Sequence, residues 1–310
     1  MSDAPSLEIA ELAARDWGRR TAPSPVSAWA IRAWCAAIGV DPSRFISGSD
    51  GAAVAPPPML QCWAGAGLHA EHMNNPTLHV RVRAAFNRAG FTAVVATNYE
   101  QAYLGDLRPG DVIEELSRVE AVSPLKQTAL GAGHFVTILF RFSNQHGAAV
   151  GTLRVRTLYF NPSGDGASRE RAAMAPNGAT IDPTPLAPPP AAVIIPVTRT
   201  MVIAGSIASN DFEAVHHDGD IARQQGLADI ILSIVTTSGL VARYALEAVG
   251  PRAVLRQLSL RLGAAAVPGD VLSMTGQWLS SDRNQLGIAG QVSRGLHVQA
   301  SVTTQPPAVA

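Results

Sequence analysis

The chain has little charge and almost no cysteine. Charged residues make up 15% of its 310 positions, and 24 basic residues balance 24 acidic ones. A formal net charge of zero gives no electrostatic argument for binding nucleic acid or an anionic membrane. Cys35 and Cys62 are the only cysteines, and they form neither a CxxC motif nor a disulfide framework. We therefore expect two buried apolar thiols and a reducing, cytoplasmic environment.

The sequence also lacks long hydrophobic runs and the common cofactor motifs. The longest apolar run, residues 230–242, has 13 residues between Asp229 and Arg243, which is too short for a bilayer and suits a buried helix. The N-terminal stretch MSDAPSLEIAELAARDWGRR carries acidic residues and no continuous apolar core, so it does not predict a signal peptide. Without GxSxG, a P-loop or a GxGxxG after a strand, serine hydrolase, NTPase and Rossmann functions have no support.

What the sequence does contain is enough apolar material, 47% of the residues, for one large or two ordinary domains. Residues 161–196 include eight prolines. This composition is typical of a linker, because proline cannot donate a hydrogen bond to a β-ladder and no apolar periodicity is present. The linker separates an N-terminal unit, residues 1–160, from a C-terminal unit, residues 197–310.

The two units show the same order of signals. The first has an apolar helical stretch ending before Asp41, then MLQCWAGAG, and strand-like segments at residues 93–99, 113–122, 134–142 and 149–160. The second has an apolar stretch ending before ASNDFEAVHHD, a long apolar helix at residues 227–249, and strand-like segments at 254–262, 271–280, 287–293 and 296–303. A Pro-Gly-Asp turn precedes the second strand-like segment of each unit. This recurrence in register indicates an internal duplication.

The helix at residues 227–249 is apolar on nearly all sides, and its charges lie near its ends. Such a helix must be buried on most of its surface, which a curved antiparallel sheet wrapped around it achieves. The predicted fold class is therefore α+β, a double hotdog made of two tandem units.

Asp211 and His216 are the candidate catalytic residues. Five positions along a fully extended strand would hold them about 16 Å apart on opposite faces, so they can cooperate only if the chain turns between them. A carboxylate and an imidazole together at the mouth of an apolar pocket can accept and deliver protons. His217 competes with His216 for this role and is the less favoured of the two.

The spacing from Asp211 to His216, followed by Asp218 and the apolar helix, resembles the hydratase motif of the MaoC-like, R-specific enoyl-CoA hydratases. The family pattern is Asp-x-Asn-Pro-x-His, whereas this chain has Glu213 and Ala214 in place of Asn-Pro. NDFEAVHHD and DIILSIVTTSGLVARY are similar to the catalytic subunit of the heteromeric branch that acts on steroid side chains. APPPMLQCWA, NYEQAYLGDLRPGD and KQTALGAGHFVT are similar to its partner subunit. The resemblance implies a fusion of the two subunits.

The resemblance also implies an activity and a set of site residues. The activity is that of a lyase, which adds water to a trans-2-enoyl-CoA on a bulky steroid side-chain thioester from cholesterol or bile acid degradation. Asp211 and His216 would jointly activate the water, and the family implies no cofactor and a homodimer. Ser238 falls where the family has a hydroxyl that orients the imidazole, although a helix serine can also bond back to a carbonyl. Backbone N–H groups near Ile230 are candidates for an oxyanion hole.

Two other functions stay open at this point: a hotdog acyl-CoA thioesterase and a non-catalytic acyl-CoA-binding protein. Thioesterases of this fold usually carry their carboxylate on the central helix, whereas Asp211 and His216 both precede it. A binding protein would need neither residue.

The N-terminal unit is expected to be non-catalytic. Asp41 occupies the place of Asp211, but the residue five positions later is Ile46, so Asp41 is predicted to be a remnant or a cap on the following turn. The segment MLQCWAGAGLHA contains two glycines, each costing about 1 kcal/mol in a helix interior. A short or broken helix here predicts a cavity that is lined by Met59, Leu60 and Trp63 and opens toward Asp211.

Three histidines, His69, His72 and His79, form a loose cluster near this segment. HExxH is absent and no carboxylate pattern accompanies them. We therefore predict loop histidines and no metal site.

Overall fold

The fold is that of a computed structural model, which describes residues 7–45, 53–65, 67–68, 76–128, 130–162, 187–250 and 253–305. Its strands form one antiparallel sheet in the order β1-β3-β5-β6-β2-β8-β11-β10-β9-β7, with β4 paired to β5. In the N-terminal unit the strands are β1 (Gly18–Thr21), β2 (Ala93–Tyr103), β3 (Glu114–Val122), β4 (Lys126–Thr128), β5 (Gly131–Ser143) and β6 (Ala149–Pro162). In the C-terminal unit they are β7 (Val193–Pro196), β8 (Val254–Leu262), β9 (Val271–Trp278), β10 (Gln285–Val292) and β11 (Gly295–Gln305).

The strand order reads the same from both edges of the sheet. β1, β3, β5, β6 and β2 of the N-terminal unit correspond to β7, β9, β10, β11 and β8 of the C-terminal unit. The two halves meet where β2 pairs with β8, with Tyr99 opposite Leu260. This symmetry is the structural form of the duplication that the sequence predicts, and the double hotdog fold class is confirmed.

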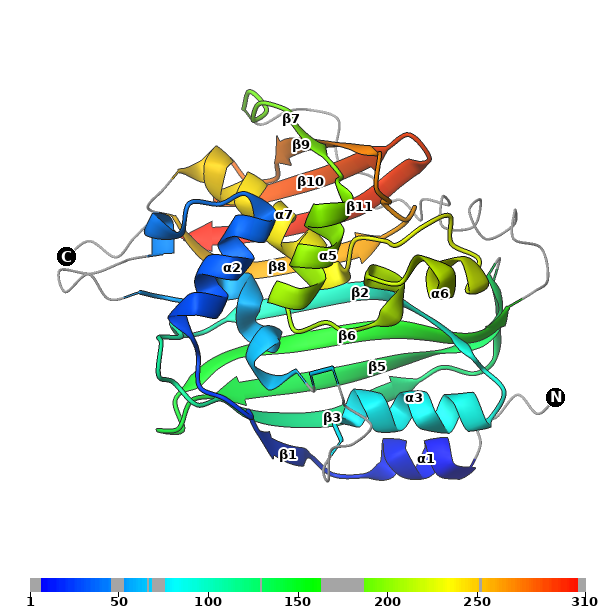
Figure 1. The fold of residues 1–310 in the computed structure, drawn as a ribbon. Helices are drawn as coiled ribbons and strands as arrows, with labels where there is room; N and C mark the ends of the chain where they lie inside the picture. The colour runs from blue at the N-terminus through cyan, green and yellow to red at the C-terminus, as the bar shows by residue number, and fades with distance from the viewer. Residues whose placement is uncertain are drawn as a thin grey trace.

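The helices gather on one side of the sheet (Figure 1). They are α1 (Leu7–Ala14), α2 (Ala28–Ile38), η1 (Pro42–Phe45), η2 (Pro57–Ala64) and α3 (Leu78–Arg88) in the first unit, and α5 (Arg199–Ala208), η4 (Ala214–His216), α6 (Gly219–Gln224) and α7 (Ile234–Val249) in the second. α7 contacts β8, β10 and β11 on one side and α2 and α5 on the other. It is therefore buried nearly all round, as its composition requires.

Close approach between helices explains two glycines in this layer. A Cβ on Gly239 of α7 would lie 2.6 Å from the Trp34 ring of α2. A Cβ on Gly205 of α5 would lie 2.5 Å from the Thr236 hydroxyl of α7. The helices from both units can pack closely because these positions have no side chain.

The long helix of the C-terminal unit begins later than predicted. It starts at Ile234 rather than Leu227, because Ser233 is its N-cap and accepts a hydrogen bond from the Thr236 N–H. The preceding residues are held by other partners, since the Leu232 N–H donates to the Ala266 carbonyl at 3.0 Å. A serine followed by an apolar run is the N-cap signal that would have given the correct start.

The central helix of the N-terminal unit was also misplaced by the sequence analysis. It is α3, not the MLQCWAGAG segment, which forms the 3₁₀ helix η2. α3 buries Leu78, Val82, Ala85 and Phe86, which recur with a helical period. The histidine, arginines and β-branched residues between them make this period hard to recognise in the sequence. The linker prediction is wrong at its end as well, because Val193–Pro196 pair with β9 as strand β7.

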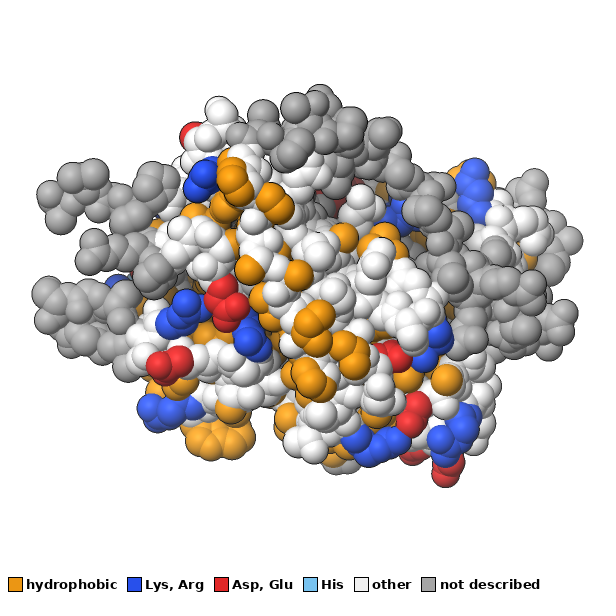
Figure 2. All heavy atoms as spheres, turned by 90° about the horizontal axis from the view of Figure 1, so that it is seen from above, with side chains coloured by type: hydrophobic (Ala, Val, Ile, Leu, Met, Phe, Trp, Pro, Cys, Tyr) orange, Lys and Arg blue, Asp and Glu red, His pale blue; other side chains and the backbone are white. Residues whose placement is uncertain are grey.

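The surface charges and the two cysteines are placed as the composition predicts. On the face seen from above in Figure 2, basic and acidic side chains are intermixed with hydrophobic ones rather than gathered by sign. Cys35 and Cys62 are free and buried, as predicted, and burial raises the pKa of Cys35 to about 12. Within the described ranges, no helix is long and apolar enough to cross a membrane.

Candidate active site

A cavity of about 590 Å³ lies between the two units. Its floor is the helix-facing side of the N-terminal sheet, from β3 through β5 and β6 to β2, and it reaches Leu262 at the end of β8. Its other walls come from η2, α3, the loop before η4 and the segment before α7. The volume is within the range of about 300–1,000 Å³ that small-molecule sites occupy.

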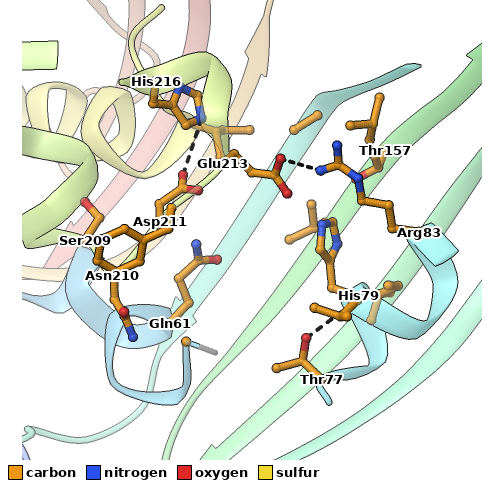
Figure 3. A pocket seen from close by; sticks show the side chains of 18 of the residues that line it. Gln61, Thr77, His79, Arg83, Thr157, Ser209, Asn210, Asp211, Glu213 and His216 are labelled. Carbon is orange, nitrogen blue, oxygen red and sulfur yellow. Dashed lines mark hydrogen bonds and ion pairs between the residues drawn. The ribbon is translucent and has the colours of Figure 1, made fainter. Parts of the chain in front are cut away.

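Asp211 and His216 lie together at this cavity. The His216 Nε2 is 3.6 Å from the Asp211 Oδ2, and the two side chains are 9% and 16% exposed. Figure 3 shows the carboxylate directed at the imidazole from the loop after α5, with η4 supplying the turn between them. The structure thus brings the two residues together as the spacing requires, while their catalytic role stays a prediction.

The position of Asp211 depends on the residue before it. Asn210 has a φ of 56°, a left-handed conformation that asparagine tolerates better than most residues. Its side-chain amide donates to the Cys62 carbonyl in η2 at 3.3 Å. The Asp211 N–H donates to the Ser206 carbonyl at 3.0 Å, and the Ser206 hydroxyl donates to the Asp211 carbonyl. The carboxylate is therefore held by α5 on one side and by the N-terminal unit on the other.

The orientation of His216 follows from one backbone contact. Its Nδ1 lies 2.8 Å from the Ile231 carbonyl, and a carbonyl can only accept a hydrogen bond. Nδ1 must therefore carry a proton, which leaves Nε2 of the neutral ring as an acceptor facing Asp211 and the cavity. An imidazole nitrogen and a carboxylate oxygen thus stand side by side at the cavity.

The N-terminal unit contributes polar side chains from α3. Arg83 forms an ion pair with Glu213 of the motif loop, and His79 lies beside it across the cavity from Asp211 (Figure 3). Burial acts to raise the pKa of Glu213, but the charge and hydrogen bond of Arg83 outweigh it and hold this pKa below its usual value. Burial lowers the pKa of His79, so this ring is neutral at pH 7. The loop between Asp211 and His216 is therefore tied to both units.

The predicted accessory residues occupy other places. The Ile230 N–H donates to the Asp229 carboxylate at 2.8 Å, and Ile230 is fully buried outside the cavity lining. Ile234, the first residue of α7, lines the cavity instead, because the helix begins there. Ser238 donates to the Val235 carbonyl at 2.8 Å and does not line the cavity. The Ser238 side chain therefore bonds back to its own helix. The imidazole of His216 is oriented by the backbone carbonyl of Ile231 instead.

The predicted acyl-pocket residues also need correction. Met59, Leu60 and Trp63 are buried in the hydrophobic core and do not line the cavity. They face inward because η2 turns its apolar side toward α7 and the sheet, leaving Gln61, Ala64 and Gly65 on the cavity side. The predicted space in the N-terminal unit exists, but it arises because the 11-residue α3 does not fill the sheet as the 16-residue α7 does.

The remaining candidates lie away from the paired groups. His217 is exposed and outside the cavity lining. Asp41 is exposed and its Oδ1 accepts a hydrogen bond from the Ser43 N–H at 2.9 Å, so it caps the turn of η1 as predicted. His69 and His72 lie outside the described residues. Among the residues that are described, no group of three or more metal-ligating side chains comes together.

Several polar residues of the lining were not among the predicted site residues. They include Gln61, His79, Arg83 and Glu115 from the N-terminal unit. No local motif marks them, because their partners are distant in sequence: Arg83 and Glu213 are 130 positions apart. For His79 and Arg83, the helical period of α3 was the signal that could have placed both on one face.

Comparison with known proteins supports the same family. The profile described as "FAS1-like, dehydratase domain region" matches residues 17–153. A "3-oxo-4,17-pregnadiene-20-carboxyl-CoA hydratase beta subunit" from Mycobacterium tuberculosis is 34% identical over 105 residues, which cover 33% of this chain and 81% of that protein. A "Probable enoyl-CoA hydratase alpha subunit" from Thermomonospora curvata is 35% identical over 151 residues, which cover 46% of this chain. This match spans about half, 47%, of the alpha subunit's own length.

The architecture is shared with solved structures. A protein described as "MaoC-like dehydratase" superposes with a TM-score of 0.68 over 96% of this chain and 100% of its own, at 16% sequence identity. At this identity the likeness concerns the fold alone. Together with the relatives, it shows that the chain belongs to the MaoC-like family of hotdog enoyl-CoA hydratases and dehydratases.

Proposed function

We propose that the protein is an enoyl-CoA hydratase, a lyase that adds water reversibly to a trans-2-enoyl-CoA to form a 3-hydroxyacyl-CoA. The observation that carries the proposal is the pair formed by Asp211 Oδ2 and His216 Nε2, held 3.6 Å apart at the cavity. Relatives named as hydratase subunits support the same reaction class.

In this reaction one water molecule donates a hydrogen bond to each acceptor. Its oxygen attacks C3 of the enoyl thioester while one acceptor takes its proton. A proton from the pair is then delivered to C2, so that one hydroxyl and one hydrogen are added overall. Positioned acid and base groups of this kind typically contribute about 10²–10⁴-fold each.

The thioester oxygen gains negative charge as C3 is attacked, and the start of α7 faces it in this proposal. The first N–H groups of a helix have no partner within the helix and carry partial positive charge. Ser233 already caps the Thr236 N–H, so we assign the oxyanion contact to the N–H of Ile234, a residue of the cavity wall. This assignment replaces the one made for Ile230.

The acyl group would occupy the cavity floor in the N-terminal unit. We propose a bulky, polycyclic acyl group of the steroid side-chain type, from cholesterol or bile acid breakdown. The volume of about 590 Å³ and the apolar strand residues support it, as does the pregnadiene thioester in the name of one relative. The R configuration of the product and a homodimer of double-hotdog chains are further parts of the proposal. Two buried, free cysteines support a cytoplasmic location.

The test is an assay that follows loss of the conjugated enoyl thioester absorbance and, in parallel, release of free thiol. A hydratase lowers the absorbance without releasing thiol. Thiol release would instead identify a thioesterase, and neither change would identify an acyl-CoA-binding protein.

Substrate size is tested with the same assay. A steroid enoyl-CoA with a shortened side chain should exceed crotonyl-CoA in kcat/KM by roughly ten-fold or more, because it buries additional apolar surface. Equal or better hydration of crotonyl-CoA would remove the steroid part of the proposal and leave the hydratase part standing.

A further inference from the structure

The floor of the cavity is mostly apolar. The strand residues that line it are mostly valine, leucine, isoleucine, phenylalanine and alanine from β2, β5 and β6. Among the described strand residues of the lining, Glu115 on β3 is the only one with a carboxyl group. A carboxyl group in such a wall needs hydrogen-bond partners, because burial without them is costly.

Glu115 is a buried side chain, 5% exposed. On one neighbouring strand it lies opposite Phe142, which stacks with Phe140 at a ring-centroid distance of 6.2 Å. On the other it lies opposite Arg20 of β1. Burial raises the pKa of Glu115 to about 7, against the opposing effects of Arg20 and a hydrogen bond with Ser117. At neutral pH the group is therefore a carboxylic acid for much of the time, able both to donate and to accept.

The separation between Glu115 and the Asp211–His216 pair determines how long a ligand must be to contact both. Burial raises the pKa of Tyr99 on β2, and the charge of Asp211 adds to this effect, so the motif lies at the β2 end of the floor. β5 and β6 separate β2 from β3. Three strand spacings of about 4.8 Å separate β2 from β3 by roughly 14 Å across the sheet. Glu115 is also displaced along β3, four residues from Val119, which the strand register places level with Tyr99.

Arg20 is the basic residue that lies opposite this carboxyl group on β1. Its guanidinium donates to the carbonyls of Ala64 and Gly65 at the end of η2, so its donors are shared with the backbone. Arg20 has too little effect on Glu115 to offset burial, because the pKa stays raised. Glu115 nevertheless belongs to the cavity lining.

We propose that Glu115 binds an oxygen-bearing group, a ketone or a hydroxyl, at the end of the acyl group remote from the thioester. The inference rests on the proposed hydratase function and specifies its substrate: a long or fused-ring enoyl thioester that is oxygenated at its distal end. Glu115 donates to a ketone or accepts from a hydroxyl, and the apolar strands bury the skeleton between the two polar ends.

The experiment compares two enoyl-CoA thioesters with the same carbon skeleton, one bearing a distal ketone and one without it. Wild type, Glu115→Gln and Glu115→Leu are assayed for kcat/KM, with crotonyl-CoA as a short substrate that does not reach β3. Equilibrium binding of the corresponding saturated acyl-CoA pair is measured by calorimetry, which requires no turnover.

The wild type should prefer the ketone by roughly ten-fold or more in kcat/KM and in affinity. Glu115→Leu should lose this preference while crotonyl-CoA hydration stays within a few-fold, and Glu115→Gln, which still donates and accepts, should keep most of it. If the wild type does not distinguish the pair, or if Glu115→Leu weakens both members and crotonyl-CoA equally, Glu115 is only a structural partner of Arg20. Failure to hydrate any enoyl-CoA overturns the hydratase function instead, and the calorimetric preference still decides the role of Glu115.

Discussion

At the scale of single residues, the candidate site depends on which ring nitrogen of His216 is hydrogen-bonded to the backbone. The Ile231 carbonyl accepts a hydrogen bond from Nδ1 at 2.8 Å, and Nε2 is left facing Asp211 at 3.6 Å. His217, one position later, is exposed. Two adjacent histidines therefore have different chemistry because the turn of η4 directs only one of them inward.

Removing either acceptor should cost nearly as much as removing both, because the two hold one water as a unit. Asp211→Asn, His216→Ala and the double variant should each lose about 10²-fold or more of kcat with unchanged folding by circular dichroism. His217→Ala and Asp41→Asn are the matched controls and should stay within a few-fold. Collapse of kcat in His217→Ala with normal turnover in His216→Ala would reverse the assignment, and a large loss in Asp41→Asn would reveal a second working site.

Glu213, inside the motif, is a positioning residue in this interpretation. Its ion pair with Arg83 ties the loop to α3, and small misplacement of reacting groups is costly. Glu213→Gln should lower kcat about ten-fold or more with little change in KM. Each single variant leaves the charge of the other residue unpaired in the cavity. The double variant Glu213→Gln with Arg83→Gln should therefore lose less kcat than the two single losses combined. Strict additivity in this double-mutant cycle would show that the pair does not position the loop.

Glu115 makes the stability of the protein depend on pH. Its pKa rises from its ordinary 4.5 to about 7 in the folded state, so the folded state holds this proton more tightly than the unfolded chain. The stabilisation is present below about pH 4.5 and is lost as the pH rises through about 7, amounting to about 3 kcal/mol at most. Arg20 across the strand pair opposes this effect.

Chemical denaturation at pH 5 and pH 8 checks this expectation. The free energy of unfolding of the wild type should fall more between the two values than that of Glu115→Gln, which cannot ionise. The comparison between the two proteins isolates one group from the other titrating residues. An identical fall in both would contradict the raised pKa.

At the scale of elements, the contact between η2 and the loop after α5 connects the two units at the site. A Cβ added to Gly65 would lie 2.4 Å from the Asn210 side-chain nitrogen and 3.1 Å from its carbonyl oxygen. Gly65 itself has a φ of −56°, which any residue adopts. Replacing it would therefore act by steric displacement and not by backbone strain.

Gly65→Ala should push Asn210, and with it Asp211, out of position. We expect kcat to fall by about ten-fold or more, with a change in melting temperature of only a few degrees. Gly18→Ala is a suitable control, because its nearest neighbour would be 3.6 Å from the new Cβ. Equal activity in both variants would show that this contact does not position the carboxylate.

At the scale of the whole molecule, neither unit forms the cavity alone. The paired acceptors come from the C-terminal unit, whereas the floor, His79 and Arg83 come from the N-terminal unit. The pairing of β2 with β8 joins the two halves of the sheet over five residue pairs, and α2 of the first unit packs on α5 and α7 of the second. The relatives include separate alpha and beta subunits, which suits a fusion of two interdependent parts.

Residues 1–162 and 187–310, produced together as two chains, should therefore associate and retain kcat within a few-fold. Each chain produced alone should be inactive, because it lacks the other half of the cavity and exposes the edge of β2 or β8. Co-purification followed by the absorbance assay measures both points. Full activity in the C-terminal chain alone would show that the N-terminal unit is dispensable.

The sequence by itself determined the repeated order of elements, most strand positions and the pairing of Asp211 with His216. These features depend on local periodicity, turn residues and short spacing, which act over a few positions. The sequence did not predict that α3 packs on the sheet. Its histidine and arginines are typical of a solvent-exposed segment, and only the tertiary structure shows a cavity beside them. For the same reason the sequence assigned the acyl pocket to Met59, Leu60 and Trp63.

Tertiary structure alone decided which polar groups face the cavity. Arg83 meets Glu213 from 130 positions away, and Glu115 reaches the floor through the lateral order of four strands. The orientation of His216 depends on a backbone carbonyl, and every residue has one, so no side-chain pattern marks it. Strand order, burial and backbone acceptors are consequences of how the two units pack, and a linear pattern carries no record of contacts made only when the chain is folded.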